Sequence, residues 1–325
     1  MMDMFILLFL GFFFGILTGF LGIGGGFLMT PALNILGFGM VYAIGTSFST
    51  IAGKTLIGAI RHYGLGNVDL RLGMILGLIS ILGVDLGKRL VFYLEELNLA
   101  DTYIRLAYIF LLLLISILML KEYFLSPRTT DEKKGTEGRK YLLASQISRI
   151  KIPPMISLPN SGVEAISIWV IVFLGILIGF LSGCMGIGGG FISLPILIYM
   201  IGTPTLIAVG TSLINVFLTS CYGTIVYALA GKVEWISVLI ILAGSFIGIQ
   251  VGVSATQYVS AMKIRLLFAL FLFSIAISIF LKQINWVTLS AYLMACSACL
   301  LSLAILLPLM KRRRGHLWPK GNLRS

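Results

Sequence analysis

The chain has 325 residues, of which 58% are hydrophobic and only 11% are charged. Soluble domains carry about twice that charged fraction, so too little polar surface exists to cover a water-soluble protein of this size. The formal net charge of +12 does not indicate nucleic-acid binding, because the basic residues gather beside apolar segments, at 128–151 and 311–324. Basic clusters in those places are typical of membrane proteins.

Long apolar segments follow one another along the chain, and such runs are typical of membrane-spanning helices. We expect spanning helices near residues 4–22, 40–62, 71–94, 103–124, 165–185, 205–230, 235–257, 262–281 and 286–310. Two further apolar pieces, 26–38 and 190–202, are too short to span as straight helices. Because helices satisfy their own backbone hydrogen bonds in lipid, the sequence predicts an all-α polytopic membrane protein.

A repeated pattern divides the chain into two halves. The glycine-rich segment Gly22–Phe27 recurs as Gly186–Phe191. Other residues recur at nearly the same spacing: Gly11, Gly15 and Gly19 with Gly175, Gly179 and Gly183; Pro31 with Pro195; Gly45-Thr46-Ser47 with Gly210-Thr211-Ser212; Gly66 and Asp69 with Gly231 and Glu234. We therefore predict two homologous repeats of about four membrane segments, at 1–124 and 164–284. A polar basic linker at 125–163 joins them, and a final helix with a basic tail occupies 285–325.

The basic linker and the basic tail also predict an orientation. An odd number of crossings per repeat, followed by one final helix, places both segments on the same side of the membrane. Since Lys and Arg gather on the cytoplasmic side, we expect a cytoplasmic linker and C-terminus, an external N-terminus, and repeats that are inverted relative to each other.

The two glycine segments are the first candidates for a binding site. Three consecutive glycines before a short apolar piece and a proline will not form a continuous helix. A broken membrane helix exposes backbone groups, and this is tolerated only where they line a cavity or are buried in protein. The N–H groups at such a break can bind an anion, so Gly24, Gly25, Gly26, Gly188, Gly189 and Gly190 are candidate substrate-binding residues. Tight helix packing is the alternative, and for Gly11, Gly15 and Gly19 it is the preferred interpretation.

Polar residues early in two helices are further candidates. Thr46, Ser47 and Thr50 of the first repeat correspond in position to Thr211, Ser212 and Asn215 of the second. Their hydroxyl and amide groups can donate to anion oxygens without adding charge. They can equally form interhelical hydrogen bonds or helix caps, and the sequence leaves both interpretations open.

Two charged residues fall inside predicted membrane helices, where a charge is by default a functional hypothesis. Lys54 could neutralise an anionic substrate, and its counterpart in the second repeat is Thr219. Alternatively, Lys54 could pair with Asp85. Asp85 also has Lys88 and Arg89 within one helical turn for a local ion pair, and a role in ion or proton coupling is a third alternative.

The paired Gly-x-Gly-Gly-Gly-Phe segments with Pro31 and Pro195, the paired Gly-Thr-Ser segments, and the turns at Gly66 and Gly231 resemble the sulfite exporter TauE/SafE family of anion permeases. The resemblance covers about residues 4–281. It implies a plasma-membrane transporter for small anions, with sulfur-containing anions such as sulfite, thiosulfate, sulfoacetate and related organosulfonates as the usual substrates. Lys54, the long basic linker and the final helix depart from the pattern.

The leading interpretation is a secondary transporter that moves a small, sulfur-containing anion by alternating access. An anion channel is the alternative. A membrane-embedded enzyme is disfavoured because the predicted spans carry neither paired acids nor a serine with a histidine base. We expect no catalytic residues, metal or cofactor. The expected partners are the anion, membrane lipid and coupled protons or ions.

Overall fold

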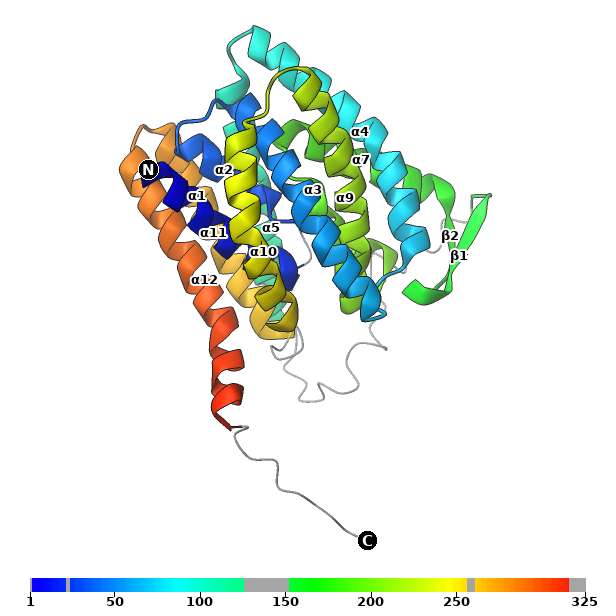
Figure 1. Ribbon diagram of the computed structural model, residues 1–325. Coiled ribbons are helices and arrows are strands. Elements are labelled where there is room, and N and C mark those ends of the chain that lie inside the picture. The colour runs from blue at the N-terminus through cyan, green and yellow to red at the C-terminus, as the bar shows by residue number, and fades with distance from the viewer. Residues whose placement is uncertain (1, 22–23, 126–151, 256–260, 316–325) are drawn as a thin grey trace.

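The protein is described here from a computed structural model, and the structure describes residues 2–21, 24–125, 152–255 and 261–315 (Figure 1). Its first half consists of five helices: α1 (Met2–Leu21), α2 (Gly26–Ile35), α3 (Met40–Gly64), α4 (Leu70–Glu96) and α5 (Ala100–Leu125). Residues 126–151, which make up most of the predicted linker, lie outside the described part, as does the tail after Gly315.

The second half repeats this order of elements. It contains α7 (Ile168–Met185), α8 (Gly190–Pro195) with its π-helical continuation η2 (Ile196–Ile201), α9 (Thr205–Leu229), α10 (Trp235–Ala255) and α11 (Ala261–Gln283), and the additional helix α12 (Val287–Gly315) follows. Each predicted spanning segment is thus a helix, and the two short apolar pieces are α2 and α8–η2. Within the described residues, six helices are long and apolar enough by themselves to cross a membrane: α4, α5, α7, α9, α10 and α12. The predicted all-α polytopic fold is confirmed.

The glycines spaced four apart lie where helices of different halves pack closely. Gly11, Gly15 and Gly19 of α1 face α10, and a Cβ at any of them would overlap a backbone oxygen of that helix. Gly179 and Gly183 of α7 lie in the same way against α4. The packing role predicted for Gly11, Gly15 and Gly19 is confirmed, because only a residue without a side chain lets two backbones approach this closely.

Helices α3 and α9 form the centre of the bundle and run in opposite directions (Figure 1). Gly45 near the start of α3 lies against the backbone of Lys232, which follows α9. Gly210 near the start of α9 lies against the backbone of Asn67, which follows α3. Each helix therefore begins at the end of the bundle where the other one ends.

A short β-hairpin precedes α7 and was not expected from the sequence. Its strands β1 (Met155–Leu158) and β2 (Val163–Ser167) are antiparallel and are joined by the 3₁₀ turn η1 (Pro159–Ser161). The hydroxyl of Ser161 donates to Asp69 Oδ2 at 2.6 Å, while Asp69 Oδ1 accepts from the backbone N–H of Leu72 at 3.0 Å and so caps α4. These bonds fix the end of the predicted linker against the α3–α4 turn.

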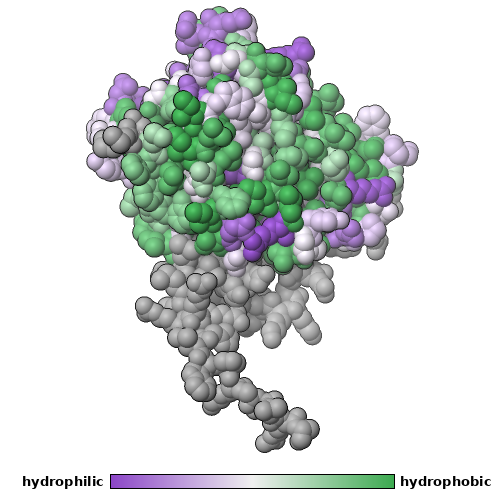
Figure 2. Space-filling view, viewed as in Figure 1, coloured by the Kyte–Doolittle hydropathy of each residue, from purple (hydrophilic) through white to green (hydrophobic). Residues whose placement is uncertain are grey.

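Hydrophobic side chains cover the middle of the face in Figure 2, whereas hydrophilic residues gather toward the upper end and the lower edge. Exposed apolar side chains on α4, α5 and α10 include Leu82, Phe110 and Leu239, each more than half exposed. In water a continuous surface of this kind would be unfavourable. In lipid it is the solvated surface of the protein.

Candidate functional site

The chain breaks between α1 and α2, and again between α7 and α8, at the two predicted glycine segments. Gly24 and Gly25 precede α2 with φ angles of 72° and 71°, and Gly188 and Gly189 precede α8 with φ angles of 71° and 83°. These left-handed conformations cost residues with a side chain about 1–2 kcal/mol. Glycine therefore lets each helix stop and restart. Residues 22 and 23 lie outside the described part.

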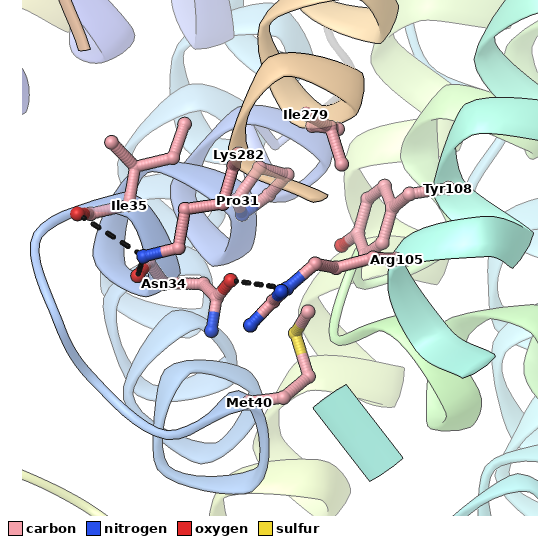
Figure 3. Close-up of a pocket in the computed structure, with 8 residues that line it drawn as sticks. All are labelled: Pro31, Asn34, Ile35, Met40, Arg105, Tyr108, Ile279 and Lys282. Carbon is pink, nitrogen blue, oxygen red and sulfur yellow. Dashed lines mark hydrogen bonds between the residues drawn. The ribbon is translucent and has the colours of Figure 1, made fainter. Parts of the chain in front are cut away.

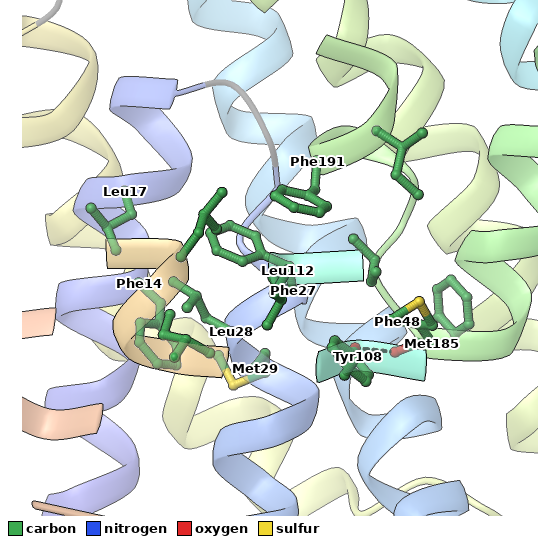
Figure 4. Close-up of a cluster of buried hydrophobic side chains, with 14 of the residues drawn as sticks. Phe14, Leu17, Phe27, Leu28, Met29, Phe48, Tyr108, Leu112, Met185 and Phe191 are labelled. Atoms are coloured by element: carbon green, nitrogen blue, oxygen red, sulfur yellow. Dashed lines mark hydrogen bonds between the residues drawn. The ribbon is translucent and has the colours of Figure 1, made fainter. Parts of the chain in front are cut away.

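The two breaks meet inside the protein. A Cβ at Gly26, the first residue of α2, would lie 2.5 Å from the carbonyl oxygen of Ile187 in the second break. The rings of Phe27 and Phe191, which follow Gly26 and Gly190, are stacked with their centroids 5.0 Å apart (Figure 4). Helices α2 and α8 therefore begin beside each other, as the hypothesis of a shared binding site requires.

Ile51 of α3 and Val216 of α9 lie against both breaks. A Cβ at Gly24 would lie 3.0 Å from Ile51 Cγ2 and 2.8 Å from Val216 Cγ1, and a Cβ at Gly188 would lie 3.0 Å and 2.9 Å from the same two atoms. Both residues stand near the middle of their helices. The two breaks thus meet about halfway along the bundle, where a transporter's substrate site is expected.

Lys54 of α3 reaches the first break. A Cβ at Gly25 would lie 3.8 Å from Lys54 Nζ and 2.6 Å from the hydroxyl oxygen of Thr18. The Lys54 side chain is 0% exposed, and its ammonium has no hydrogen-bond partner among the described residues. A buried ammonium without a partner is costly, so this position calls for an acceptor.

Polar groups of the second half lie in the corresponding place. A Cβ at Gly189 would lie 3.9 Å from Asn215 Nδ2 and 3.8 Å from Ser182 Cβ, and a Cβ at Gly188 would lie 2.6 Å from Ser220 Oγ. The amide of Asn215 and the hydroxyls of both serines are buried and have no partner among the residues described. We call the following residues the break cluster: Gly24, Gly25, Gly188, Gly189, Lys54, Asn215, Ser182 and Ser220.

The break cluster combines one ammonium with neutral amide and hydroxyl donors. Helix α2 adds the positive end of its dipole, because Gly25 stands at its N-terminus. None of the cluster's side chains is a carboxylate, an imidazole or a thiolate. This chemistry is suited to a small anion whose oxygens accept several hydrogen bonds at once.

Thr46 and Thr211 each form a hydrogen bond with a turn of the opposite half of the chain. Thr46 Oγ1 accepts from the backbone N–H of Glu234 at 3.1 Å, and Thr211 Oγ1 accepts from the backbone N–H of Asp69 at 2.9 Å. These hydrogen bonds tie α3 and α9 to the connections that follow α9 and α3. Of the two interpretations left open for these threonines, the structure shows hydrogen bonding between elements.

Three other candidates have hydrogen bonds outside the break cluster. Ser47 Oγ accepts from the hydroxyl of Thr30 at 2.9 Å, Ser212 Oγ donates to the Val209 carbonyl at 2.8 Å, and Thr50 Oγ1 donates to the Ser47 carbonyl at 2.9 Å. All three are buried. Their hydroxyls are thus engaged within α3 and α9 or between α2 and α3, and not at the break cluster.

Asp85 of α4 does not pair with Lys54. Its carboxylate lies 3.0 Å from Lys88 Nζ and 2.8 Å from Arg89 Nε, and it accepts from the hydroxyl of Tyr222 at 3.2 Å. The local ion pair, one of the alternatives predicted for this residue, is therefore present, and the pairing with Lys54 is wrong. The separation arises because Lys88 and Arg89 lie within one turn of Asp85 on the same helix.

Thr18, Ser182 and Ser220 were not among the predicted site residues. A signal for two of them exists in the sequence, because Thr18 precedes Gly19 as Ser182 precedes Gly183, each as an isolated polar residue in an apolar helix. Ser220 gives no comparable signal. Only the packing of α9 against the second break reveals its position.

The far end of α2 is fixed by charged residues of α5 and α11 (Figure 3). Lys282 Nζ donates to the carbonyl of Asn34 at 2.7 Å, and Arg105 Nε donates to Asn34 Oδ1 at 3.0 Å. Asp101 accepts from the Asn34 amide and from the backbone N–H of Met40, both at 3.1 Å. A small pocket lies among these side chains. Lys282 thus satisfies a carbonyl at the negative end of α2, while the positive end points toward the break cluster.

Comparisons with known proteins indicate the family of the chain. A family model described as "Sulfite exporter TauE/SafE" matches residues 7–279. A "Probable membrane transporter protein" of Xylella fastidiosa is 28% identical over 279 residues, which cover 85% of this chain and 94% of the relative. A protein of the same name in Haemophilus influenzae is 30% identical over 82% of this chain and 94% of its own length. The "Probable membrane transporter protein YunE" of Bacillus subtilis is 26% identical over 79% and 89%. No solved structure gives a significant match.

Proposed function

The chain belongs to the sulfite exporter TauE/SafE family, and on that premise we propose that this multi-pass membrane transporter is a secondary carrier for a small, sulfur-containing anion. The candidate substrates are sulfite, thiosulfate, sulfoacetate and related organosulfonates. We propose that the anion binds at the break cluster, and that the carrier works in the plasma membrane by alternating access.

The observation that carries this proposal is Lys54, a fully buried lysine with no counter-ion or hydrogen-bond partner among the described residues. An unpaired buried charge costs several kcal/mol. An anion next to Gly25 would supply the missing counter-charge at the positive end of α2. Asn215, Ser182 and Ser220 would then donate to its remaining oxygens from the second half.

The chemistry of the cluster supports the sulfur-containing class. Sulfite and sulfonate groups carry three oxygens around one sulfur atom, and each oxygen accepts more than one hydrogen bond. Donors of the break cluster come from α3, α7 and α9, that is, from both halves. A compact oxyanion would be able to contact donors of all three helices at once.

Alternating access follows from the burial of the site. Every side chain of the break cluster is buried, so an anion reaches it only when the surrounding helices separate. The opposite directions of α3 and α9 are those of two inverted repeats. Opening at one end and then at the other would therefore use equivalent motions of the two halves.

The proposed orientation places the connection between α5 and the hairpin, and the end of α12, on the cytoplasmic side. The end of α12 lies at the lower end of the bundle in Figure 1, and the N-terminus lies in its upper part. Labelling of single cysteines introduced at Gly37 and at Gly64, in a cysteine-free background, tests this orientation. An impermeant thiol reagent should label position 37 from outside intact cells and position 64 only after permeabilisation.

Counterflow in proteoliposomes tests the carrier itself. Vesicles loaded with unlabelled thiosulfate, sulfite or sulfoacetate should accumulate the same labelled anion from a dilute external solution, and chloride should not replace it. Lys54→Met should abolish this accumulation. Gly64→Leu serves as the matched control, because no atom lies within 4 Å of a Cβ at Gly64. Labelled anion that equilibrates without counterflow would indicate a channel.

A further inference from the structure

Lys54 poses a problem whenever the proposed site is empty. Its side chain is 0% exposed, and no carboxylate of the described residues pairs with it to balance an ammonium. A carrier must nevertheless release its anion and return without it. If Lys54 stayed charged during that return, every transport cycle would include the free-energy cost of an unpaired charge in a buried site.

The charged and titratable groups around Lys54 are few. Helices α9 and α10, which pack against α3, contain no Asp, Glu, Lys, Arg or His, and neither does α2. Helix α5 brings Asp101 and Arg105, but they bond at the far end of α2. Helix α4 brings Asp85, which is paired with its own neighbours.

Helix α1 contributes no charged group between residues 4 and 21. On α3 itself, Arg61 and His62 follow Lys54 by about two turns, and Arg61 donates to Gln250 of α10. Among the described Asp, Glu, Lys, Arg and His side chains, Lys54 is thus the one at the meeting point of the breaks, and His62, which is also buried, lies about two turns away on α3.

The second half has no equivalent of this lysine. Thr219 occupies the matching position, and its hydroxyl donates to the carbonyl of Gly188 at 2.7 Å. The two breaks therefore share one titratable amine. A site of this composition takes up one proton at most.

We infer that Lys54 carries a proton across the membrane together with the anion, so that the protein is a proton–anion symporter. This inference rests on the proposed function. In the outward or inward open state, the neutral amine of Lys54 takes one proton from water as the anion binds beside it, and the pair crosses as an ion pair. On the other side the anion leaves and the ammonium returns its proton to water. The empty carrier then reorients with a neutral amine.

This cycle determines the net charge that crosses the membrane with each anion. A monovalent sulfonate crosses with one proton and no net charge, and a divalent anion such as thiosulfate crosses with one net negative charge. Asp85 plays no part in the cycle, because its carboxylate is held by Lys88, Arg89 and Tyr222.

The test uses the full-length protein in proteoliposomes that contain a trapped pH-sensitive dye. Methanesulfonate serves as the monovalent probe and thiosulfate as the divalent probe, because both stay ionised near neutral pH. Counterflow, net uptake and internal pH are followed for the wild-type protein, for Lys54→Arg and for Lys88→Arg. Lys88→Arg is the matched control, since it makes the same substitution at the ion pair on the surface of α4.

In the wild-type protein, net uptake of either anion should acidify the vesicle interior, and an imposed membrane potential should affect thiosulfate uptake but not methanesulfonate uptake. Lys54→Arg should lose both net uptake and acidification, whatever fraction of counterflow it retains, because an arginine does not release its proton. Lys88→Arg should behave like the wild-type protein.

Counterflow without acidification in the wild-type protein would overturn the symport and leave the carrier standing. Acidification that persists in Lys54→Arg would overturn the assignment of the proton to Lys54. An absence of counterflow for every anion, in protein shown to be folded, would overturn the proposed function and the symport with it. The wild-type measurement stands even if the arginine variant does not fold.

Discussion

The two breaks share the glycines that lead into their second helices and differ in the side chains beside them. Each has two adjacent left-handed glycines before a helix that starts with a glycine and a phenylalanine, and the second break has a further left-handed glycine, Gly186. The first break, however, has Lys54 beside it, and the second has Thr219, whose hydroxyl donates a hydrogen bond to the carbonyl of Gly188. The shared glycines explain how two breaks can meet. The single lysine explains why their meeting point favours one anion.

The helices that leave the breaks differ as well. Helix α2 is regular over ten residues, and its C-terminal end is held by Lys282, Arg105 and Asp101. Helix α8 is α-helical over six residues and continues as the π-helical segment η2, which ends at Gly202. The first half thus fixes a rigid helix with its positive end at the site. The second half supplies neutral donors from α7 and α9.

The largest effect is expected from replacing the left-handed glycines that both breaks share. Gly25→Leu and Gly189→Leu each place a side chain on a left-handed residue and into its neighbours, so we expect each to abolish transport while leaving membrane insertion intact. Uptake into proteoliposomes measures this, with Gly64→Leu as the control. Normal uptake by both folded variants would show that the breaks are not part of the site.

Replacing Lys54, the residue that distinguishes the first break from the second, should have the next largest effect. Lys54→Thr makes the two halves alike and removes a charged hydrogen bond, so the half-saturating anion concentration should rise by about 10- to 100-fold. Adding Thr219→Lys to this variant should recover part of the loss, because the lysine then stands beside the second break. An unchanged half-saturating concentration in Lys54→Thr would contradict the proposed role of the lysine.

The neutral donors of the second half should contribute less. Asn215→Thr places in the second half the residue type that occupies the matching position, Thr50, in the first. Losing a neutral hydrogen bond of about 0.5–1.5 kcal/mol should raise the half-saturating concentration by about 3- to 10-fold. Binding of a labelled sulfonate to purified protein measures this directly. A loss as large as that of Lys54→Thr would mean that the amide, and not the ammonium, dominates binding.

The smallest effect is expected at a turn where the halves also differ. Lys232, after α9, lies 2.6 Å from Glu95, whereas Asn67 occupies the matching position after α3. Both partners of this pair are about one-quarter to one-third exposed, and exposed pairs contribute about 0–1 kcal/mol. Glu95→Gln should therefore lower the thermal stability slightly and leave transport unchanged. Thermal unfolding in detergent measures the first effect and proteoliposome uptake the second.

The pH dependence of this small contribution has a defined sign. The hydrogen bond from Lys232 to Glu95 raises the pKa of the lysine. The contribution of the charged lysine to stability is then fully present below the pKa of lysine in the unfolded chain, about 10.4. It is lost as the pH rises through the folded pKa. The difference in melting temperature between Glu95→Gln and the wild-type protein should therefore stay constant through the neutral range and shrink only in strong alkali. A difference that changes near pH 7 would contradict this origin.

The sequence was most informative where composition and local rules decide the structure. Apolar runs predicted the spanning helices, and the paired glycine segments predicted two broken ones, because glycine and proline act within a few residues of their own position. The β-hairpin was missed, since its position depends on the bond from Ser161 to Asp69, a residue far earlier in the chain.

The sequence by itself therefore determined the membrane class, the order of helices and the places where helices break. Only the tertiary structure decided that the two breaks meet, that Lys54 has no partner there among the described residues, and that Asp85 pairs with its own helix and not with Lys54. The reason is physical. Helix formation follows from hydrogen bonds and side chains within a few turns, whereas the partner of a buried charge is set by the packing of helices from different parts of the chain.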